Sequence, residues 1–146
     1  MTADFFAYGS LIFPEIMYEV TGCRLKTKDA VLKNYSRYLV EEACYPGITK
    51  NKGSYITGKL YSELSQTAFK ALDDFEGKLY RRIEVEIVTE FETLRAQTFA
   101  IAPKYEGRLS NQPWSPNLFR KKHFDAFLQE IKSERHKRKS SDISLS

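Results

Sequence analysis

The segment LDDFEGKLYRRIEVEIV, residues Leu72–Val88, joins two kinds of hydrophobic periodicity at a single glycine. Before Gly77 the apolar residues recur every three or four positions, which predicts a helix with one buried face. After it they recur at every second position, which is typical of a half-buried strand. The helix positions are Leu64, Ala68, Ala71, Leu72 and Phe75, and the strand positions are Ile83, Val85 and Ile87. Because glycine commonly ends a helix, this segment predicts a helix that leads directly into a strand.

Other segments predict strands on both sides of this one. The aromatic run Asp4–Tyr8 (DFFAY) is typical of a buried strand that ends in a turn at Gly9 and Ser10. Residues 29–40 and 53–64 have the β-branched and aromatic content of strands, and residues 94–102 predict an antiparallel partner for residues 80–88. Tyr45–Ile48 (YPGI) separates the two middle strands and has the composition of a turn.

Two more helices complete the predicted fold. One begins at Pro14 and ends at Gly22, and the other begins at Pro116 with Ser115 as its N-cap. The last helix carries an apolar stripe of Phe119, Phe124, Phe127, Leu128 and Ile131. Several strands separated by turns, with helices between and after them, predict an α+β domain with a curled, largely antiparallel sheet or a small barrel.

The length of 146 residues suits one domain, and we assign it to residues 1–134. After Glu134 the apolar stripe is lost, so residues 135–146 are expected to form a disordered basic tail. Most of the excess positive charge lies between Arg120 and Lys139. We interpret it as a solvated helix face that runs into this tail, in preference to a nucleic-acid binding surface.

Composition and motifs also indicate the cellular compartment and exclude several classes of catalytic site. No apolar run is long enough to cross a bilayer, no secretory signal is evident, and two isolated cysteines fit a reducing cytosol, so a cytoplasmic protein is expected. The sequence contains no HExxH or CxxC motif, no phosphate-binding GxxxxGK[ST] or GxGxxG, and no GxSxG around Ser10. We therefore expect neither a metal nor a cofactor.

Glu76 is the candidate catalytic group because it is an acid at the wrong end of a helix. The C-terminal pole of the helix, the neighbouring Asp73 and Asp74, and partial burial all disfavour its ionised form and predict a raised pKa. A raised pKa is what a general base or acid near neutral pH requires. The alternative is an exposed carboxylate that pairs with Lys78, Arg81 or Arg82. Asp73 and Asp74 themselves are expected to be solvated.

The turn at Gly9 and Ser10 offers a complementary group. A strand that ends in a glycine turn leaves consecutive backbone N–H groups free, and these can hold a carbonyl oxygen or a carboxylate. A plain turn without a binding role is the alternative.

Three motifs in this order resemble the γ-glutamylcyclotransferase-like superfamily, in the branch of γ-glutamylamine cyclotransferases and plant avirulence-induced proteins. They are YGSL (Tyr8–Leu11), YPGI (Tyr45–Ile48) and LDDFEGKLYRR (Leu72–Arg82), and PWSPNLFRKKHFDAF (113–127) resembles the plant members. The resemblance implies a small mixed β-barrel flanked by helices and a reaction without cofactor. In that reaction the substrate's α-amine attacks its own γ-glutamyl carbonyl and releases 5-oxoproline and an amine or amino acid.

The resemblance also implies roles for individual residues. Glu76 would take a proton from the α-ammonium group and later deliver one to the leaving nitrogen. The loop residues would bind the glutamyl group largely through backbone N–H groups, and Tyr45 and Tyr80 would line the cavity. The loop comprises Tyr8, Gly9, Ser10 and Leu11, continued by Ile12 and Phe13.

The leaving group stays open among an amino acid, a peptide such as the remainder of glutathione, and a lysine side chain, and no oligomeric state is assigned. A binding or regulatory protein that keeps the pocket without turnover is the alternative function.

Overall fold

A computed structural model describes the backbone of residues 1–145 and the side chains of residues 1–135. Six strands, four α-helices and three short 3₁₀ turns alternate along the described chain. In order, they are β1 (Thr2–Ala7), η1 (Ser10–Ile12), α1 (Pro14–Thr21), β2 (Thr27–Val40), β3 (Pro46–Ser65), α2 (Gln66–Glu76), η2 (Gly77–Leu79), β4 (Tyr80–Val88), β5 (Thr93–Ile101), η3 (Pro103–Arg108), β6 (Leu109–Pro113), α3 (Pro116–Lys122) and α4 (Phe124–Leu145). The predicted α+β class is confirmed.

The strands form one sheet in the order β3-β1-β5-β4-β2-β6, and β3 pairs additionally with β2. Only β1 and β5 pair in parallel, at Phe5 and Gln97, so the sheet is mixed and mostly antiparallel, as predicted. Because β3 pairs with both β1 and β2, the sheet is strongly curled. We describe it as a curled six-stranded sheet, which is one of the two forms that the sequence predicted, and do not call it a barrel.

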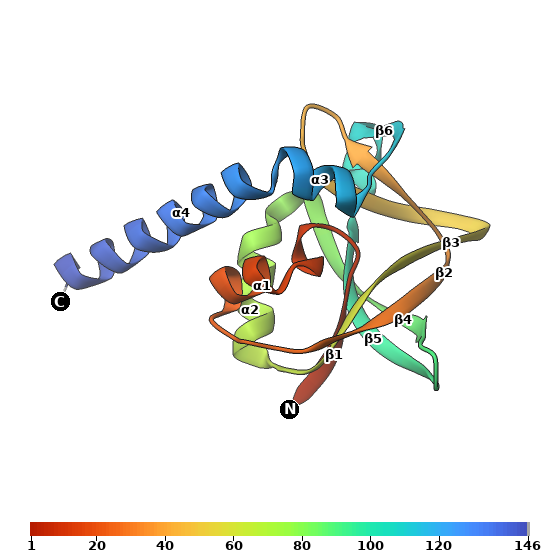
Figure 1. The fold of residues 1–146 in the computed structure, drawn as a ribbon, viewed down its shortest axis with the longest axis horizontal. Helices are drawn as coiled ribbons and strands as arrows, with labels where there is room; N and C mark the ends of the chain where they lie inside the picture. The colour runs from red at the N-terminus through yellow and green to blue at the C-terminus, as the bar shows by residue number, and fades with distance from the viewer. Residues whose placement is uncertain (146) are drawn as a thin grey trace.

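The curled sheet has a different core on each of its faces. Phe5 points into a cluster with the helices, where it meets Phe69 of α2 edge to face with ring centroids 6.2 Å apart. Phe6 points into a second cluster between strands, with Leu32, Ile56 and other aliphatic side chains. The helices α1, α2 and α3 lie on one side of the sheet, and α4 extends away from the body (Figure 1). Burial on both faces explains why Phe5 and Phe6, which are consecutive residues of β1, are both apolar.

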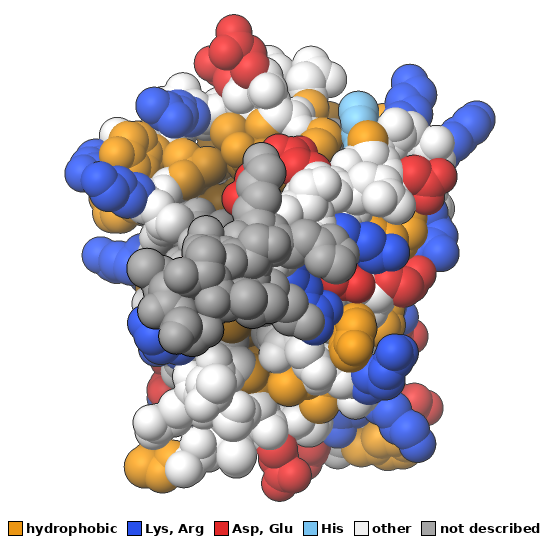
Figure 2. Space-filling model, turned by 90° about the vertical axis from the view of Figure 1, so that its left-hand side faces the viewer, with side chains coloured by type: hydrophobic (Ala, Val, Ile, Leu, Met, Phe, Trp, Pro, Cys, Tyr) orange, Lys and Arg blue, Asp and Glu red, His pale blue; other side chains and the backbone are white. Residues whose placement is uncertain are grey.

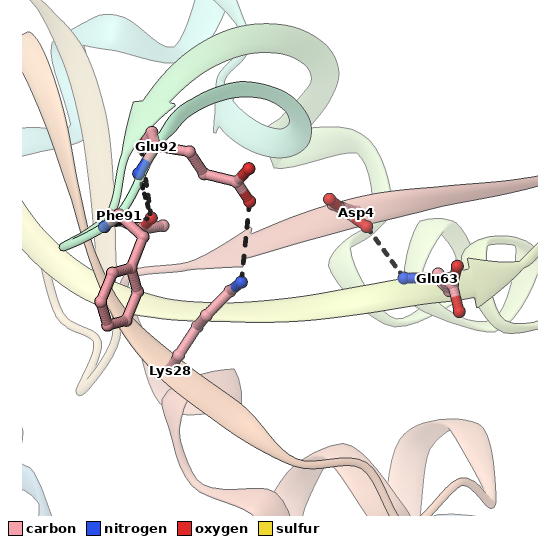
Figure 3. A network of polar contacts seen from close by, with 6 residues as sticks. Asp4, Lys28, Glu63, Phe91 and Glu92 are labelled. Carbon is pink, nitrogen blue, oxygen red and sulfur yellow. Dashed lines mark hydrogen bonds and ion pairs between the residues drawn. The ribbon is translucent and has the colours of Figure 1, made fainter.

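A β-bulge interrupts the pairing of β1 with the end of β3. The pairing register shifts between Ala3 and Phe5, and Glu63 opposite them adopts a left-handed φ of 58°. The Asp4 carboxylate accepts a hydrogen bond of 2.9 Å from the Glu63 backbone N–H, as Figure 3 shows. Lys28 and Glu92, also drawn there, form an exposed ion pair of 3.9 Å between β2 and the β4–β5 turn. The Asp4 side chain thus offsets a backbone conformation that glutamate rarely adopts.

Three local expectations differ from the structure. Residues Tyr45–Ile48 were predicted as a turn, but β3 already begins at Pro46, where a missing N–H is tolerated at the first residue of a strand. The predicted last helix is divided at His123, the C-cap of α3, so that the apolar stripe spans two helices. Strand β6 was not predicted, because LSNQP has no apolar alternation.

Helix α4 carries the chain beyond the predicted domain boundary at 134, to Leu145. The side chains from residue 136 onward lie outside the described residues, and so does residue 146. The disorder of residues 135–146 stays a prediction. Within the part of the chain that the structure describes, no helix is both long enough and apolar enough to cross a membrane.

Candidate active site

A cavity of about 420 Å³ opens where the end of β1, the end of α2 and one face of α4 meet. The chain supplies its lining from segments far apart in sequence. The lining residues are Phe5, Phe6, Ala7, Tyr8, Gly9, Ser10, Leu11, Tyr45, Pro46, Asp74, Phe75, Glu76, Leu79, Tyr80, Thr98, Phe99, Phe127, Glu130, Ile131 and Glu134. The volume falls within the range of small-molecule pockets. The structure therefore brings Glu76 and the YGSL loop to one cavity.

Glu76 is the last residue of α2, and its side chain is partly buried in this cavity. Burial raises the pKa of its carboxyl group from 4.5 to about 8. The direction agrees with the sequence argument, but burial is the cause, whereas the helix pole and the neighbouring aspartates were also expected to contribute. No ion pair among the described residues involves Glu76.

The neighbours of Glu76 in sequence have other roles. Asp73 is exposed and its carboxylate lies 3.4 Å from the Nε atom of Arg82 on β4. Asp74 is exposed at the edge of the cavity. Gly77 ends the helix with a positive φ of 68°, and its N–H donates to the Asp73 carbonyl. The helix therefore stops where the sequence predicted, with Glu76 turned toward the cavity and Asp73 toward Arg82.

Residues 8–11 of the glycine loop line the cavity. Two backbone N–H groups are already bonded in the 3₁₀ turn of this loop, because the N–H of Ile12 donates to the Gly9 carbonyl at 3.0 Å and that of Phe13 to the Ser10 carbonyl at 3.3 Å. The N–H groups of Gly9, Ser10 and Leu11 donate to no acceptor among the described turn and loop hydrogen bonds. They are the donors available for a ligand carbonyl or carboxylate.

Gly9 is required here by close packing. A Cβ atom added to it would lie 3.0 Å from Cδ and 3.1 Å from Cγ of Pro46. Those contacts are tight because Pro46, the first residue of β3, lies against this loop and lines the same cavity. Pro46 belongs to the YPGI motif, but the sequence did not predict its contact with Gly9.

Ile12 and Phe13 lie outside the cavity. After Leu11 the 3₁₀ turn directs the chain into the helical core, where the Phe13 ring stacks on Phe119 at 5.7 Å and meets Phe124 edge to face at 5.2 Å. Their backbone N–H groups are also occupied. The structure therefore gathers the predicted loop residues Tyr8 to Leu11 at the site and places the two that follow in the core.

Three tyrosines enclose the site. The Tyr8 hydroxyl donates to the Phe99 carbonyl, and the Tyr80 hydroxyl donates to the Pro46 carbonyl at 2.6 Å. Burial is the main cause of raised pKa values for both hydroxyls, and the Glu76 carboxylate adds to each. Both therefore stay protonated near neutral pH. Tyr45 lines the cavity from the loop between β2 and β3.

Helix α4 forms a wall that the sequence did not predict for the site. Phe127 packs edge to face on Phe75 of α2, with ring centroids 6.3 Å apart, while Ile131, Glu130 and Glu134 also line the cavity. An ion pair of 3.0 Å between Arg135 and Glu19 fastens this helix to α1. The apolar stripe predicted a buried face, but its period contains no information about which element it would contact.

The charged and ionisable groups at the cavity include four carboxyl groups and no basic side chain. The acidic residues are Asp74, Glu76, Glu130 and Glu134. On the face in Figure 2, Lys and Arg side chains are spread around the described surface with Asp and Glu between them and do not gather in one patch. Among the described residues, no group of three or more His, Cys, Asp or Glu side chains has the arrangement of a metal site.

Comparisons with known proteins give one consistent answer. Residues 5–116 match the family described as gamma-glutamyl cyclotransferase, AIG2-like. Protein AIG2 C of Arabidopsis thaliana is 27% identical over 126 residues, which cover 85% of this chain and 76% of that protein. A solution structure of an Arabidopsis thaliana protein matches with a TM-score of 0.70 at 25% identity and covers 95% of this chain and 85% of its own. A structure titled gamma-glutamyl cyclotransferase shares the fold with a TM-score of 0.62 at 16% identity, covering 72% of this chain and 74% of its own.

Proposed function

Since the chain belongs to the gamma-glutamyl cyclotransferase, AIG2-like family, we propose that it is an enzyme that converts a γ-glutamyl compound into 5-oxoproline and a free amine or amino acid. The observation that carries this proposal is the meeting of Glu76, with a pKa of about 8, and the Tyr8–Leu11 loop at one cavity. The substrate is a small molecule and the site is proposed to work without a cofactor.

In the proposed reaction, Glu76 removes a proton from the α-ammonium group of the substrate. The resulting amine attacks the γ-carbonyl carbon, so that a ring C–N bond forms and negative charge develops on the carbonyl oxygen. The proposed donors to this oxygen are the N–H groups of Gly9, Ser10 and Leu11, which line the cavity and donate to no acceptor among the described turn and loop hydrogen bonds. Glu76 then delivers this proton to the leaving nitrogen, and the original amide C–N bond breaks as the carbonyl re-forms. The ring nitrogen gives its second proton to the departing amine, which leaves as an ammonium ion.

The proposed reaction needs few catalytic groups, because the nucleophile and the electrophile belong to one substrate. An α-amine is largely protonated at neutral pH and needs a base before it can attack. A folded substrate pose supplies much of the rate, since holding two reacting groups together replaces an encounter between molecules. One carboxylate and a set of backbone donors can therefore suffice.

The proposal is tested by incubating the purified protein with γ-glutamyl compounds and measuring 5-oxoproline. A matched set consists of γ-glutamyl-butylamine, γ-glutamyl-1,4-diaminobutane and γ-glutamyl-4-aminobutyrate, with γ-glutamyl-ε-lysine and glutathione added. Release of 5-oxoproline from at least one compound is expected. Binding without release from any of them would instead favour a non-catalytic binding protein that keeps the pocket.

The charge of the leaving group should govern the rate with the matched set. Because the cavity lining includes carboxylates and no lysine or arginine, we expect kcat/KM to fall in the order diaminobutane, butylamine, aminobutyrate. Each step should be roughly five- to tenfold, about 1 kcal/mol for a charge near partly exposed carboxylates, and should shrink in 0.5 M salt.

The double substitution Glu130→Gln and Glu134→Gln should reduce the differences in kcat/KM among the three compounds, because it removes the two cavity carboxylates of α4. Glu90→Gln, in the exposed turn between β4 and β5, is the control and should leave the order unchanged. A preference for the anionic compound would contradict the expected role of Glu130 and Glu134.

The ionisation of Glu76 should be visible in the free protein. Its carboxyl ¹³C resonance is expected to titrate near pH 8, where burial places its pKa, and kcat/KM should rise with pH up to that value as the base becomes ionised. Carbon-detected NMR across pH 4 to 10 measures the first and initial rates the second. A resonance that titrates near the ordinary glutamate value would show that the carboxyl is solvated.

A further inference from the structure

Arg37 on β2 is a partly buried arginine that points at the glycine loop. Its Nη1 atom donates to the Tyr8 carbonyl at 2.8 Å and to the Thr57 carbonyl at 3.2 Å. Its guanidinium lies over the ring of Trp114, 5.2 Å from the ring centroid. None of the ion pairs among the described residues includes it. Removing a cation from water without a carboxylate partner is costly, so this placement calls for a function.

The hydrogen bond from Arg37 fixes the orientation of one peptide group. No peptide bond in the described chain is cis, so the N–H of Gly9 points opposite to the Tyr8 carbonyl. Tyr8 and Gly9 line the cavity, whereas Arg37 does not. Arg37 therefore holds the carbonyl on the side away from the ligand and leaves the Gly9 N–H on the side that faces it.

The other end of the loop is held in the same way. The buried Tyr61 hydroxyl donates to the Leu11 carbonyl at 2.7 Å. With the Tyr8 carbonyl bound by Arg37 and the Leu11 carbonyl bound by Tyr61, neither carbonyl oxygen can turn into the cavity, where it would repel a developing negative charge. A cation on the Tyr8 carbonyl also polarises the Tyr8–Gly9 peptide and strengthens Gly9 as a donor.

From these contacts we propose that Arg37 is a positioning residue of the site, which acts through the Tyr8–Gly9 peptide to aim the Gly9 N–H at the reacting carbonyl oxygen. This inference rests on the proposed cyclotransferase reaction. Neither lysine nor a neutral side chain reproduces the arrangement, because only the planar guanidinium can stack on Trp114 while it donates to two carbonyls.

The test compares Arg37→Met and Arg37→Gln with wild type, with Arg24→Met as a matched control. Arg24 is exposed and also lies over an aromatic ring, that of Tyr18 at 4.3 Å, but it does not line the cavity. We expect kcat of the Arg37 variants to fall roughly tenfold to a hundredfold, as when one oxyanion donor is impaired, with KM changed less than about twofold. Arg37→Lys should recover part of kcat, and Arg24→Met should match wild type.

A second measurement needs no turnover. In ¹H–¹⁵N spectra, the Gly9 amide resonance should shift in both uncharged Arg37 variants and stay in place in Arg24→Met. If wild type releases no 5-oxoproline, the proposed function fails while this measurement still decides the role of Arg37. A folded Arg37→Met or Arg37→Gln protein with kcat within twofold of wild type, or with an unshifted Gly9 amide, overturns the inference. Melting temperatures identify a variant that has lost its fold, and the other variants then decide.

Discussion

Replacement of Glu76 by glutamine is expected to lower kcat for 5-oxoproline release by roughly a hundredfold to ten-thousandfold, the range typical of losing a general acid or base. Glutamine has nearly the same shape, so the cavity and the Tyr8–Leu11 loop should persist, but it cannot accept the α-ammonium proton. Initial rates under saturating substrate measure the loss. Full activity in this variant would remove Glu76 from the mechanism.

The same substitution should change how stability depends on pH. The folded protein raises the pKa of Glu76 from 4.5 to about 8, so between these values it binds a proton that the unfolded chain releases. Stability from this group is therefore complete below pH 4.5 and is lost as pH rises through about 8. Glu76→Gln should abolish this loss and be more stable than wild type at pH 9 by on the order of a few kcal/mol.

Urea unfolding at pH 5, 7 and 9 measures this difference, and the gap between the two proteins should widen with pH. Glu90→Gln in the exposed β4–β5 turn is the control and should show wild-type behaviour at each pH. A stability gap that is independent of pH would mean that Glu76 is ionised in the folded protein throughout this range.

Among the glycine-to-alanine substitutions of this chain, Gly58→Ala should cause the largest loss of stability. A Cβ atom at Gly58 would lie 2.3 Å from the Ala7 carbonyl oxygen and 2.8 Å from Cζ of Phe6. The first of these atoms is backbone, so β1 and β3 would have to separate where Ala7 pairs with Lys59. We expect a cost of roughly 3 kcal/mol or more, at the upper end for overpacking, and a fall in Tm of about 10 °C.

The matched control for this substitution is Gly107→Ala. A Cβ atom there would meet no atom within 4 Å, so its Tm should stay within a few degrees of wild type. Calorimetry or thermal circular dichroism compares the two variants. Equal melting temperatures would show that β1 and β3 are farther apart than the contact at Gly58 implies. Because Tyr8 follows Ala7 directly, the displaced strand should also weaken turnover.

What sequence predicted well in this protein was encoded locally. The change of period at Gly77 marked the end of α2 and, after the short turn Gly77–Leu79, the start of β4. The acid before Gly77 is Glu76, whose pKa burial raises. The turn after the first strand likewise pointed to the loop of Tyr8 to Leu11. Each of these signals lies within a few residues of the feature it predicts.

What sequence missed depends on contacts between distant segments. Arg37 reaches the Tyr8 carbonyl from 29 positions away, and Pro46 approaches Gly9 from the start of β3. The α4 wall depends on how a helix packs, which hydrophobic spacing does not specify. The break between α3 and α4 at His123 was not predicted, because no glycine or proline marks it. Strand β6 was not predicted, because its sequence does not alternate between apolar and polar residues.

The ion pair of Arg135 with Glu19 holds α4 against α1, and α4 is the part of the cavity that we expect to differ most between members of the family. The family match ends at residue 116, whereas α4, which the ion pair fastens against the cavity, begins at Phe124. Glu76, the proposed base, and the glycine loop thus lie inside the segment that the family model matches, and Glu130 and Glu134 of α4 lie after it. Under the proposed function, we expect that exchange of the terminal helix between relatives would change the preference for the leaving group and leave the proposed base in place.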